Sequence, residues 1–191
     1  VDDAFCEAAN RAISDTRYNG YWINYTNYFL GARLDHGVPQ RKLAMIRVGS
    51  GLYERIEEEA WSKLDMEIHE HPVIEGEVGE IEARIDHRDF RGLAKFLDRH
   101  KDYALWEARR LRALEAGGPD SWQKFTSRQR FKYRHVRKWW YPWLYFLYAY
   151  VLKRGFLDGA AGFHYAFYKA WYFLTIRLLL RSEAAGSGQS T

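Results

Sequence analysis

Apolar residues follow short alternating patterns in the first half of the chain and long helical patterns in the second half. Phe5, Ala9 and Ile13 recur every four residues, which predicts a short helix over residues 3–13. Gly20–Leu30 is rich in β-forming Tyr, Trp, Ile and Phe, and Lys42–Val48 alternates between polar and apolar residues. These two segments predict strands, with a loop at Gly31.

Pro72–His87 predicts a β-hairpin that turns at Glu75 and Gly76. In its second strand, polar and apolar side chains alternate after Gly79. Because residues two apart face the same way, one face carries the stripe Ile81, Ala83, Ile85 and His87.

A long helix is predicted from a cap at Asp89 to about Ala116, where Gly117, Gly118 and Pro119 end it. Its apolar seam is Phe90, Leu93, Leu97, Ala104, Ala108 and Leu111. Basic, aromatic helices follow, separated by Gly155, Gly159 and Gly162. The pattern predicts an α/β fold, with a mixed sheet over residues ~15–90 and amphipathic C-terminal helices. We expect a domain over 1–118, helices over 119–183 and a disordered tail over 184–191.

Charge changes this interpretation, because residues 121–157 hold nine cations and no Asp or Glu. Lys and Arg are attracted to lipid phosphates, and Trp and Tyr rings settle at the depth of the headgroups. The stretch therefore favours the surface of an anionic membrane. The candidate membrane residues are Arg137, Lys138, Trp139, Trp140, Trp143, Lys153 and Arg154.

Neither apolar helix in this region is typical of a membrane span. Trp139–Leu152 contains fourteen residues, or about 21 Å of helix, which is shorter than the ~30 Å hydrocarbon core. Gly162–Leu180 is interrupted by Lys169 and Arg177. The pattern favours interfacial or re-entrant helices; a basic-rimmed helical core or a soluble oligomer face is the alternative.

Candidate chemistry lies in the middle of the chain. Glu70 stands between His69 and His71, where it could act as a general base, although an acid in an acidic loop has the same appearance. His87 ends an apolar strand face and could bind a metal or be hydrogen-bonded in the core. Arg41, Lys42 and Arg47 could meet phosphates or be solvated.

Several segments in order resemble one family. They are Asn27–Gly31, Leu43–Arg47, Ile68–Glu70, Gly76–Ile81, Ile85–His87, and Arg154–Gly159 followed by Gly162. Together they resemble the second half of bacterial family-2 glycosyltransferases of the lipopolysaccharide-core type. The resemblance covers roughly residues 15–181.

The resemblance implies a GT-A fold and inverting transfer of a sugar from a nucleotide-sugar to a lipid-linked or glycan acceptor. Glu70 matches the acceptor-side base, and His69, Arg41 and Arg47 are the expected substrate-binding residues. A Mg²⁺ or Mn²⁺ ion would hold the diphosphate, with His87 as a candidate ligand. The family's Asp-x-Asp motif would lie upstream of Val1, so the chain corresponds to the acceptor-side half.

The implied location is the cytoplasmic face of the bacterial inner membrane, held peripherally. The single Cys6 excludes an intramolecular disulfide and favours a reducing compartment. A homo-oligomer is possible through an exposed sheet edge. Two other functions fit the basic, aromatic stretch: a non-catalytic membrane-surface module, and single-stranded nucleic-acid binding. The contiguous aromatics disfavour nucleic acid as a partner.

Overall fold

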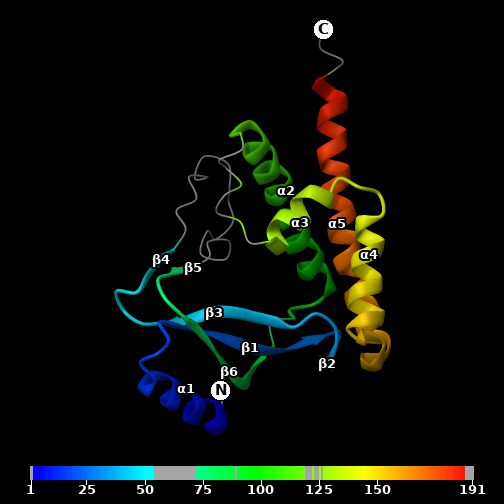
Figure 1. Cartoon of the computed structure of the whole chain (residues 1–191). Helices are drawn as coiled ribbons and strands as arrows, with labels where there is room; N and C mark the ends of the chain where they lie inside the picture. Colours follow the sequence, from blue (N-terminus) through cyan, green and yellow to red (C-terminus); the bar gives the residue numbers. More distant parts are fainter. Residues whose placement is uncertain are drawn as a thin grey trace.

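The computed structural model describes residues 2–53, 72–88, 90–118, 122, 125 and 127–187. The protein is a mixed α/β structure in which strands come first and helices follow, as the sequence predicts (Figure 1). Its helices are α1 (Asp3–Ser14), α2 (Leu93–Ala116), α3 (Ser127–His135), α4 (Tyr141–Leu147), the π-helix η3 (Tyr148–Leu152), the 3₁₀-helix η4 (Gly155–Asp158) and α5 (Gly159–Ser187). Its strands are β1 (Gly20–Phe29), β2 (Ala32–Leu34), β3 (Gln40–Ile46), β4 (Gly51–Tyr53), β5 (Pro72–Ile74) and β6 (Val78–His87).

Strand β1 organises the main sheet, because it pairs with β2, β3 and β6. The pairs with β2 and β3 are antiparallel, and the pair with β6 is parallel. Leu30 and Gly31 connect β1 to β2, and both have positive φ, 50° and 80°. A two-residue hairpin of this kind needs left-handed conformations, which Gly adopts at no steric cost.

The hairpin predicted for Pro72–His87 is wrong. β5 pairs with β4 in a small second sheet, whereas β6 runs parallel to β1. Asn19, just before β1, explains the difference: its backbone N–H donates to the Glu77 carbonyl, and its side-chain amide donates to the Glu75 carbonyl. The turn is thus fixed beside the start of β1, and β6 leaves it in the same direction as β1.

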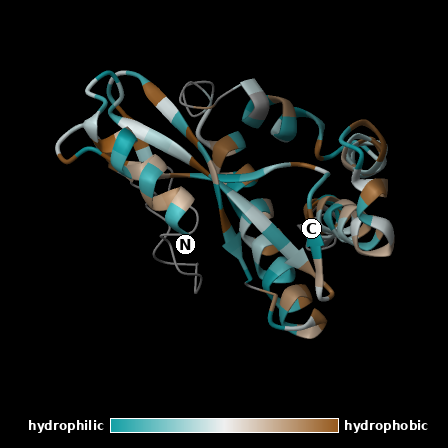
Figure 2. Ribbon diagram, turned by 90° about the horizontal axis from the view of Figure 1, so that it is seen from below, coloured by the Kyte–Doolittle hydropathy of each residue, from teal (hydrophilic) through white to brown (hydrophobic). Residues whose placement is uncertain are grey.

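Helix α1 covers one part of this sheet, as the view from below shows (Figure 2). Asp2 caps the helix by accepting the N–H of Phe5 at 2.9 Å. Phe5 and Ala12 pack against Tyr21, Ile23 and Ile81 of β1 and β6. The Tyr21 hydroxyl also donates to the carbonyl of Ala12, at 2.7 Å, which fixes the C-terminal end of the helix on the sheet.

Helix α2 ends at Ala116, as predicted, but begins later than predicted. Its N-cap is Gly92, with φ 95°, and no side chain caps it. Asp89, the expected cap, lies outside the described residues. Ala104, Ala108 and Leu111 of the predicted seam are buried against the C-terminal helices. This core also contains Phe125, Tyr133, Val136, Tyr141, Phe173, Ile176 and Leu180, so it crosses the boundary expected at residue 118.

Two further predictions for the helical half are corrected. Gly162 does not separate helices but lies inside α5, where its backbone packs against Gly155. The disordered tail predicted from residue 184 is also wrong as far as Ser187, because α5 continues to that residue. The two Ala residues at 184 and 185 favour helix, which offsets the small polar character of this segment.

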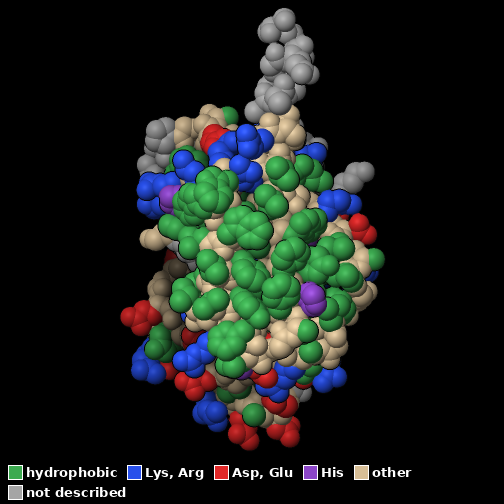
Figure 3. Space-filling view, turned by 90° about the vertical axis from the view of Figure 1, so that its right-hand side faces the viewer, with side chains coloured by type: hydrophobic (Ala, Val, Ile, Leu, Met, Phe, Trp, Pro, Cys, Tyr) green, Lys and Arg blue, Asp and Glu red, His purple; other side chains and the backbone are tan. Residues whose placement is uncertain are grey.

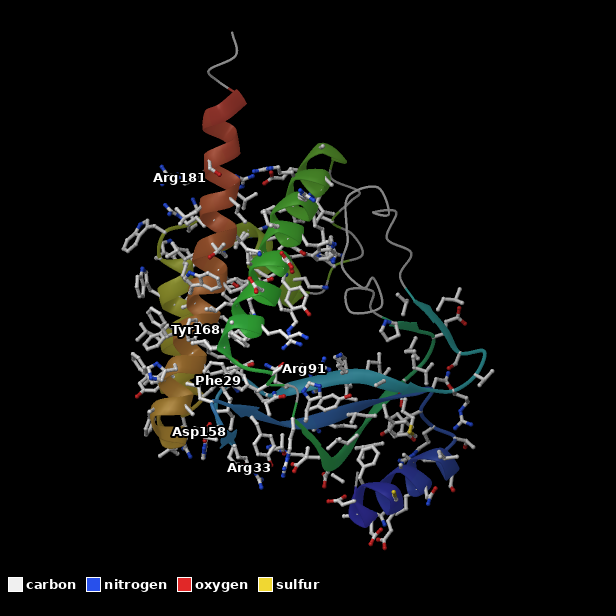
Figure 4. The ribbon with its side chains drawn as sticks, turned by 180° about the vertical axis from the view of Figure 1, so that it is seen from behind. Phe29, Arg33, Arg91, Asp158, Tyr168 and Arg181 are labelled. Carbon is white, nitrogen blue, oxygen red and sulfur yellow. The ribbon has the colours of Figure 1, made fainter. Side chains whose placement is uncertain are left out.

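Phe29 joins the sheet to the helices, and its side chain is 1% exposed. Four rings surround it edge-on, with centroid distances of 5.0–6.1 Å: Phe90, Phe96, Tyr165 and Tyr168. Phe96 lies on α2, and the two tyrosines lie on α5, so three elements meet at one ring. Figure 4 shows Phe29 at the end of the sheet, close to Tyr168 and Asp158.

The close approach of Gly162 to Gly155 gives a stability prediction. A methyl group at Gly162 would meet the carbonyl oxygen of Gly155 and the Asp158 side chain. Overpacking of this kind costs about 1–3 kcal/mol, more than the ~1 kcal/mol that Ala gains over Gly inside a helix. We expect Gly162→Ala to lower the free energy of unfolding in a urea titration.

The control is Ala160→Gly, an exposed position in the same helix. It should lose only the intrinsic helix preference, about 1 kcal/mol or less. A Gly162→Ala protein more stable than the wild type would show that the turn has room for a side chain.

Candidate functional site

The expected catalytic group cannot be placed. Glu70 and its neighbours His69 and His71 lie outside the described residues. The role of Glu70 as a base therefore stays a prediction.

His87 is exposed at the C-terminal end of β6, and its ring contacts the Tyr25 ring at 5.3 Å. It lies in register with Asn27 of β1, at the end of the apolar stripe, as the alternation predicts. Within the described part of the chain, no three His, Cys, Asp or Glu side chains converge as metal ligands would. The role of His87 as a ligand of a divalent metal therefore stays a prediction.

Arg41 and Arg47 lie at different points of the sheet, and both contact protein groups. The Arg41 guanidinium lies 4.7 Å from the Trp22 ring centroid and 3.5 Å from the Glu80 carboxylate, so it crosses β1 from β3 to β6. Arg47 follows β3 and donates to the backbone carbonyl of Asp15 at 3.2 Å. The structure does not bring these two predicted phosphate ligands together.

The most distinctive surface is a broad apolar face on α4, η3, η4 and α5, which we call the α4–α5 face (Figure 3). Its aromatic and aliphatic side chains are 38–73% exposed. They are Trp139, Trp143, Leu144, Leu147, Tyr148, Val151, Leu152, Phe156, Leu157, Phe163 and Phe167.

This face is exposed because the C-terminal helices are apolar on both sides. In α5, one side buries Phe173, Ile176 and Leu180 against α2 and α4, while Phe163 and Phe167 remain 40% and 43% exposed. A helix that is apolar all round is normally covered on every side. The described residues cover only the inner side. The exposed apolar residues form one continuous patch, whereas those of an ordinary surface are scattered singly.

Cations lie at both ends of the α4–α5 face. At one end, two cations precede α4: Arg134 and Lys138, which lie close to Trp139 in sequence. At the other end, two cations follow η3: Lys153 and Arg154. All four cations are exposed, and within the described residues none has a carboxylate partner. Figure 3 shows Lys and Arg gathered along the upper edge of the apolar area.

Acids of α2 neutralise other cations of the same stretch. Lys132 pairs with Glu107 at 2.7 Å, and Arg137 pairs with Glu115 at 2.7 Å. Of the predicted membrane residues, Trp140 packs partly into the helical core, whereas Trp139 and Trp143 are 68% and 53% exposed. The acid-free composition of residues 121–157 therefore overstates the charge that the surface presents.

A buried carboxylate connects this helical layer to the loop between β2 and β3. The side chain of Asp158, 5% exposed, accepts the N–H of Asp35 at 3.2 Å and the N–H of His36 at 2.9 Å. It also lies 2.8 Å from His36 Nδ1. Because an ionised carboxylate only accepts, Nδ1 carries a proton and Nε2 is left for another partner.

A second buried polar contact links α2 and α5. Lys169 Nζ lies 3.3 Å from His100 Nε2, and His100 Nδ1 lies 2.9 Å from the carbonyl oxygen of Phe96. The carbonyl can only accept, so Nδ1 carries the proton and Nε2 accepts from the amine. Burial, together with the Lys169 charge, lowers the pKa of His100 to about 4. Burial also lowers the pKa of Lys169 to about 8.

None of the described helices combines the length and the apolar character needed to cross a bilayer. Comparisons of the chain with protein-family models, curated proteins and solved structures found no match.

The sequence interpretation missed four of these polar residues: His36, Asp158, His100 and Lys169. Asp158 stands in the Arg154–Gly159 segment, which carries part of the resemblance, but its partner His36 is 122 residues away. The available signal for the second contact was a cation, Lys169, in an otherwise apolar stretch of helix.

The lowered pKa of His100 predicts acid-dependent stability. The unfolded chain binds a proton at the ordinary pKa of 6.5, while the folded state resists protonation until about pH 4. Stability should therefore fall as the pH drops from 6.5 to 4, by about 3 kcal/mol from this group. We expect urea unfolding of the wild type to lose more stability between pH 7 and 4.5 than that of His100→Gln.

Acidic groups elsewhere titrate in both proteins, so the difference between the two slopes isolates His100. Equal slopes would show that the imidazole is protonated equally well in the folded and unfolded chains.

Proposed function

We propose that this protein docks on an anionic membrane surface through the α4–α5 face, as the acceptor-side part of an inverting glycosyltransferase with a GT-A-like fold. The observation that carries the docking proposal is the exposed apolar face with cations at both ends. Its expected location is the cytoplasmic face of a bacterial inner membrane, held peripherally.

Burial of rings and aliphatic chains supplies most of the expected affinity. Full burial of one large apolar side chain contributes about 1.5–3 kcal/mol, so a half-exposed residue can still gain roughly 1 kcal/mol on entering the interface. A cation near an anionic surface contributes about 1 kcal/mol, and less in salt. Because apolar residues on the face outnumber its cations, salt should weaken docking without abolishing it.

The sheet is held firmly against the docking helices, which supports a catalytic arrangement close to the lipid. Phe29 of β1 packs into rings of α2 and α5, and Asp158 fixes the loop that follows β2. Substrate bound near the sheet would therefore stay at a fixed distance from the membrane surface.

The glycosyltransferase part of the proposal rests on the resemblance. In such a reaction the acceptor hydroxyl gives its proton to a carboxylate, proposed to be Glu70. The acceptor oxygen then bonds to the anomeric carbon of the donor sugar, and the bond from that carbon to the nucleoside diphosphate breaks. The resemblance also implies Mg²⁺ or Mn²⁺ at the diphosphate. The Arg154–Gly159 segment, which carries part of the resemblance, forms a tightly packed structural joint in this protein.

A non-catalytic membrane-surface module is the second candidate, favoured by the same exposed face. The two functions differ only in sugar transfer, so a transfer assay separates them. Single-stranded nucleic acid fits less well, because the exposed residues between the cations are aliphatic as well as aromatic.

Vesicle flotation tests docking. We expect the wild type to float with vesicles that contain phosphatidylglycerol, and less with pure phosphatidylcholine. The double variant Trp143→Glu/Leu147→Glu places two charges on residues that are each 53% exposed. Its partition coefficient should fall at least tenfold, which corresponds to about 1.4 kcal/mol.

The matched control is Ile13→Glu/Leu52→Glu, which charges two exposed apolar positions on α1 and β4. It should float like the wild type. A wild type that stays in the soluble fraction with every vesicle and at every salt concentration would remove the docking proposal.

Sugar transfer tests the catalytic proposal. Measured together with the donor-binding region that the resemblance places upstream of Val1, Glu70→Gln should lower the turnover by about 10²–10⁴-fold, the usual cost of losing a general base. Vesicle docking should not change. Glu75→Gln, in the turn before β6, is the control and should keep near-normal turnover. Normal turnover of Glu70→Gln would exclude Glu70 as the base.

A further inference from the structure

We propose that the loop at residues 35–37 and the turn at Lys153 and Arg154 form a site for the headgroup of a lipid that ends in a phosphomonoester or diphosphate. This inference rests on the proposed membrane docking and names the lipid chemistry that one end of the α4–α5 face selects.

His36 is held ready for a ligand by a buried carboxylate. Asp158 accepts hydrogen bonds from the backbone N–H of His36 and from its Nδ1–H, at distances of 2.9 and 2.8 Å. The His36 side chain is 38% exposed, and among the described residues no group forms a hydrogen bond with Nε2. Protonated at this nitrogen, the ring can donate to a phosphate oxygen, as histidine does when a carboxylate orients it.

The two cations are held next to this loop by a backbone contact. The N–H of Gly37 donates to the carbonyl of Lys153 at 2.8 Å. Arg154 adopts a left-handed conformation, with φ 57°, in the turn between η3 and η4. The turn is closely packed, because a Cβ at Gly155 would lie 2.8 Å from the Ala149 carbonyl oxygen.

The local charges leave these cations unbalanced. Asp35 pairs with Arg33 at 2.8 Å, and Asp158 is occupied by His36 and the loop backbone. Among the described residues, the Lys153 ammonium lies 5.6 Å from the centroid of the Tyr148 ring and pairs with no carboxylate, and the Arg154 guanidinium forms no ion pair. Two exposed cations and a histidine donor suit a headgroup with more than one negative charge.

Apolar residues beside the cations suit the chain of the same lipid. Leu152, Phe156 and Leu157 are 73%, 46% and 54% exposed, and they flank Lys153 and Arg154 in sequence. A phosphate at the turn would therefore leave its hydrocarbon chain on the α4–α5 face. A soluble phosphate would use the cations and leave these residues in water.

At the opposite end of the face, no carboxylate among the described residues orients a histidine beside the exposed cations. Arg134 and Lys138 are exposed there beside Trp139, but the neighbouring Arg137 is paired with Glu115. These cations should attract any anionic surface without selecting a headgroup, so they provide the matched control.

The test compares vesicles that contain phosphatidic acid, a phosphomonoester lipid, with phosphatidylglycerol vesicles of equal surface charge. The wild type should bind phosphatidic acid about tenfold more tightly. Lys153→Gln/Arg154→Asn should reduce this preference to twofold or less while weakening binding to phosphatidylglycerol about threefold. Asn replaces Arg154 because it tolerates the left-handed conformation. Arg134→Gln/Lys138→Gln should weaken binding to both lipids equally and keep the preference.

His36→Gln, which cannot become cationic, should lower the preference at least twofold; an unchanged preference would exclude His36 from the site. Equal thermal melting curves by circular dichroism establish that each variant is folded. Wild-type binding to phosphatidylglycerol without any preference would overturn the headgroup site and leave membrane docking intact, whereas no binding to either vesicle would overturn both. Loss of the preference in low millimolar inorganic phosphate would assign the site to soluble phosphate instead.

Discussion

The packing of Phe29 is the interaction on which the arrangement of this protein depends. One buried ring at the end of the central strand contacts rings from α2 and α5, so the sheet and the helices share a single joint. Asp158 adds a polar contact between the same layers, because its carboxylate accepts hydrogen bonds from two backbone N–H groups of the loop after β2. Aromatic packing supplies the cohesion, and the carboxylate fixes the orientation.

This joint separates two surfaces with different chemistry. The sheet presents polar and aromatic groups, such as Arg41 over Trp22, whereas the outer side of the C-terminal helices is almost wholly apolar. A soluble monomer gains nothing from such an outer side, because each exposed ring orders water around it. The proposed docking on a lipid surface would resolve this conflict, because the lipid would cover the rings and leave the sheet accessible from the aqueous side.

Local patterns predicted the elements that local interactions decide. Helix α1 and strands β1 and β3 form where the local patterns predict them, and Gly117 ends α2 as expected. The face of α1 was predicted less well, because Ala12 is buried while Ile13 is 60% exposed. The pairing of β6 with β1 could not be predicted, since it depends on a side chain of Asn19 more than fifty residues away. Composition could not separate the exposed Trp143 from the half-buried Trp140 either, because both belong to one aromatic cluster and only the packing of α4 distinguishes them. For the same reason, the contact of Asp158 with His36 needed the fold to reveal it.

The π-helix η3 has a consequence for how this region tolerates insertions and deletions. The N–H of Lys153 donates to the carbonyl of Tyr148, five residues earlier, so this turn holds one residue more than an α-helical turn would. Removing one residue here would restore ordinary helical winding, but everything that follows would be rotated by about 100°. Gly155 would no longer pack against Ala149, and Asp158 would no longer reach the backbone N–H groups of the loop after β2. The extra residue therefore sets the rotation of η4 and α5 about the helix axis relative to α4. Single-residue deletions should be far less tolerated here than at the end of α5.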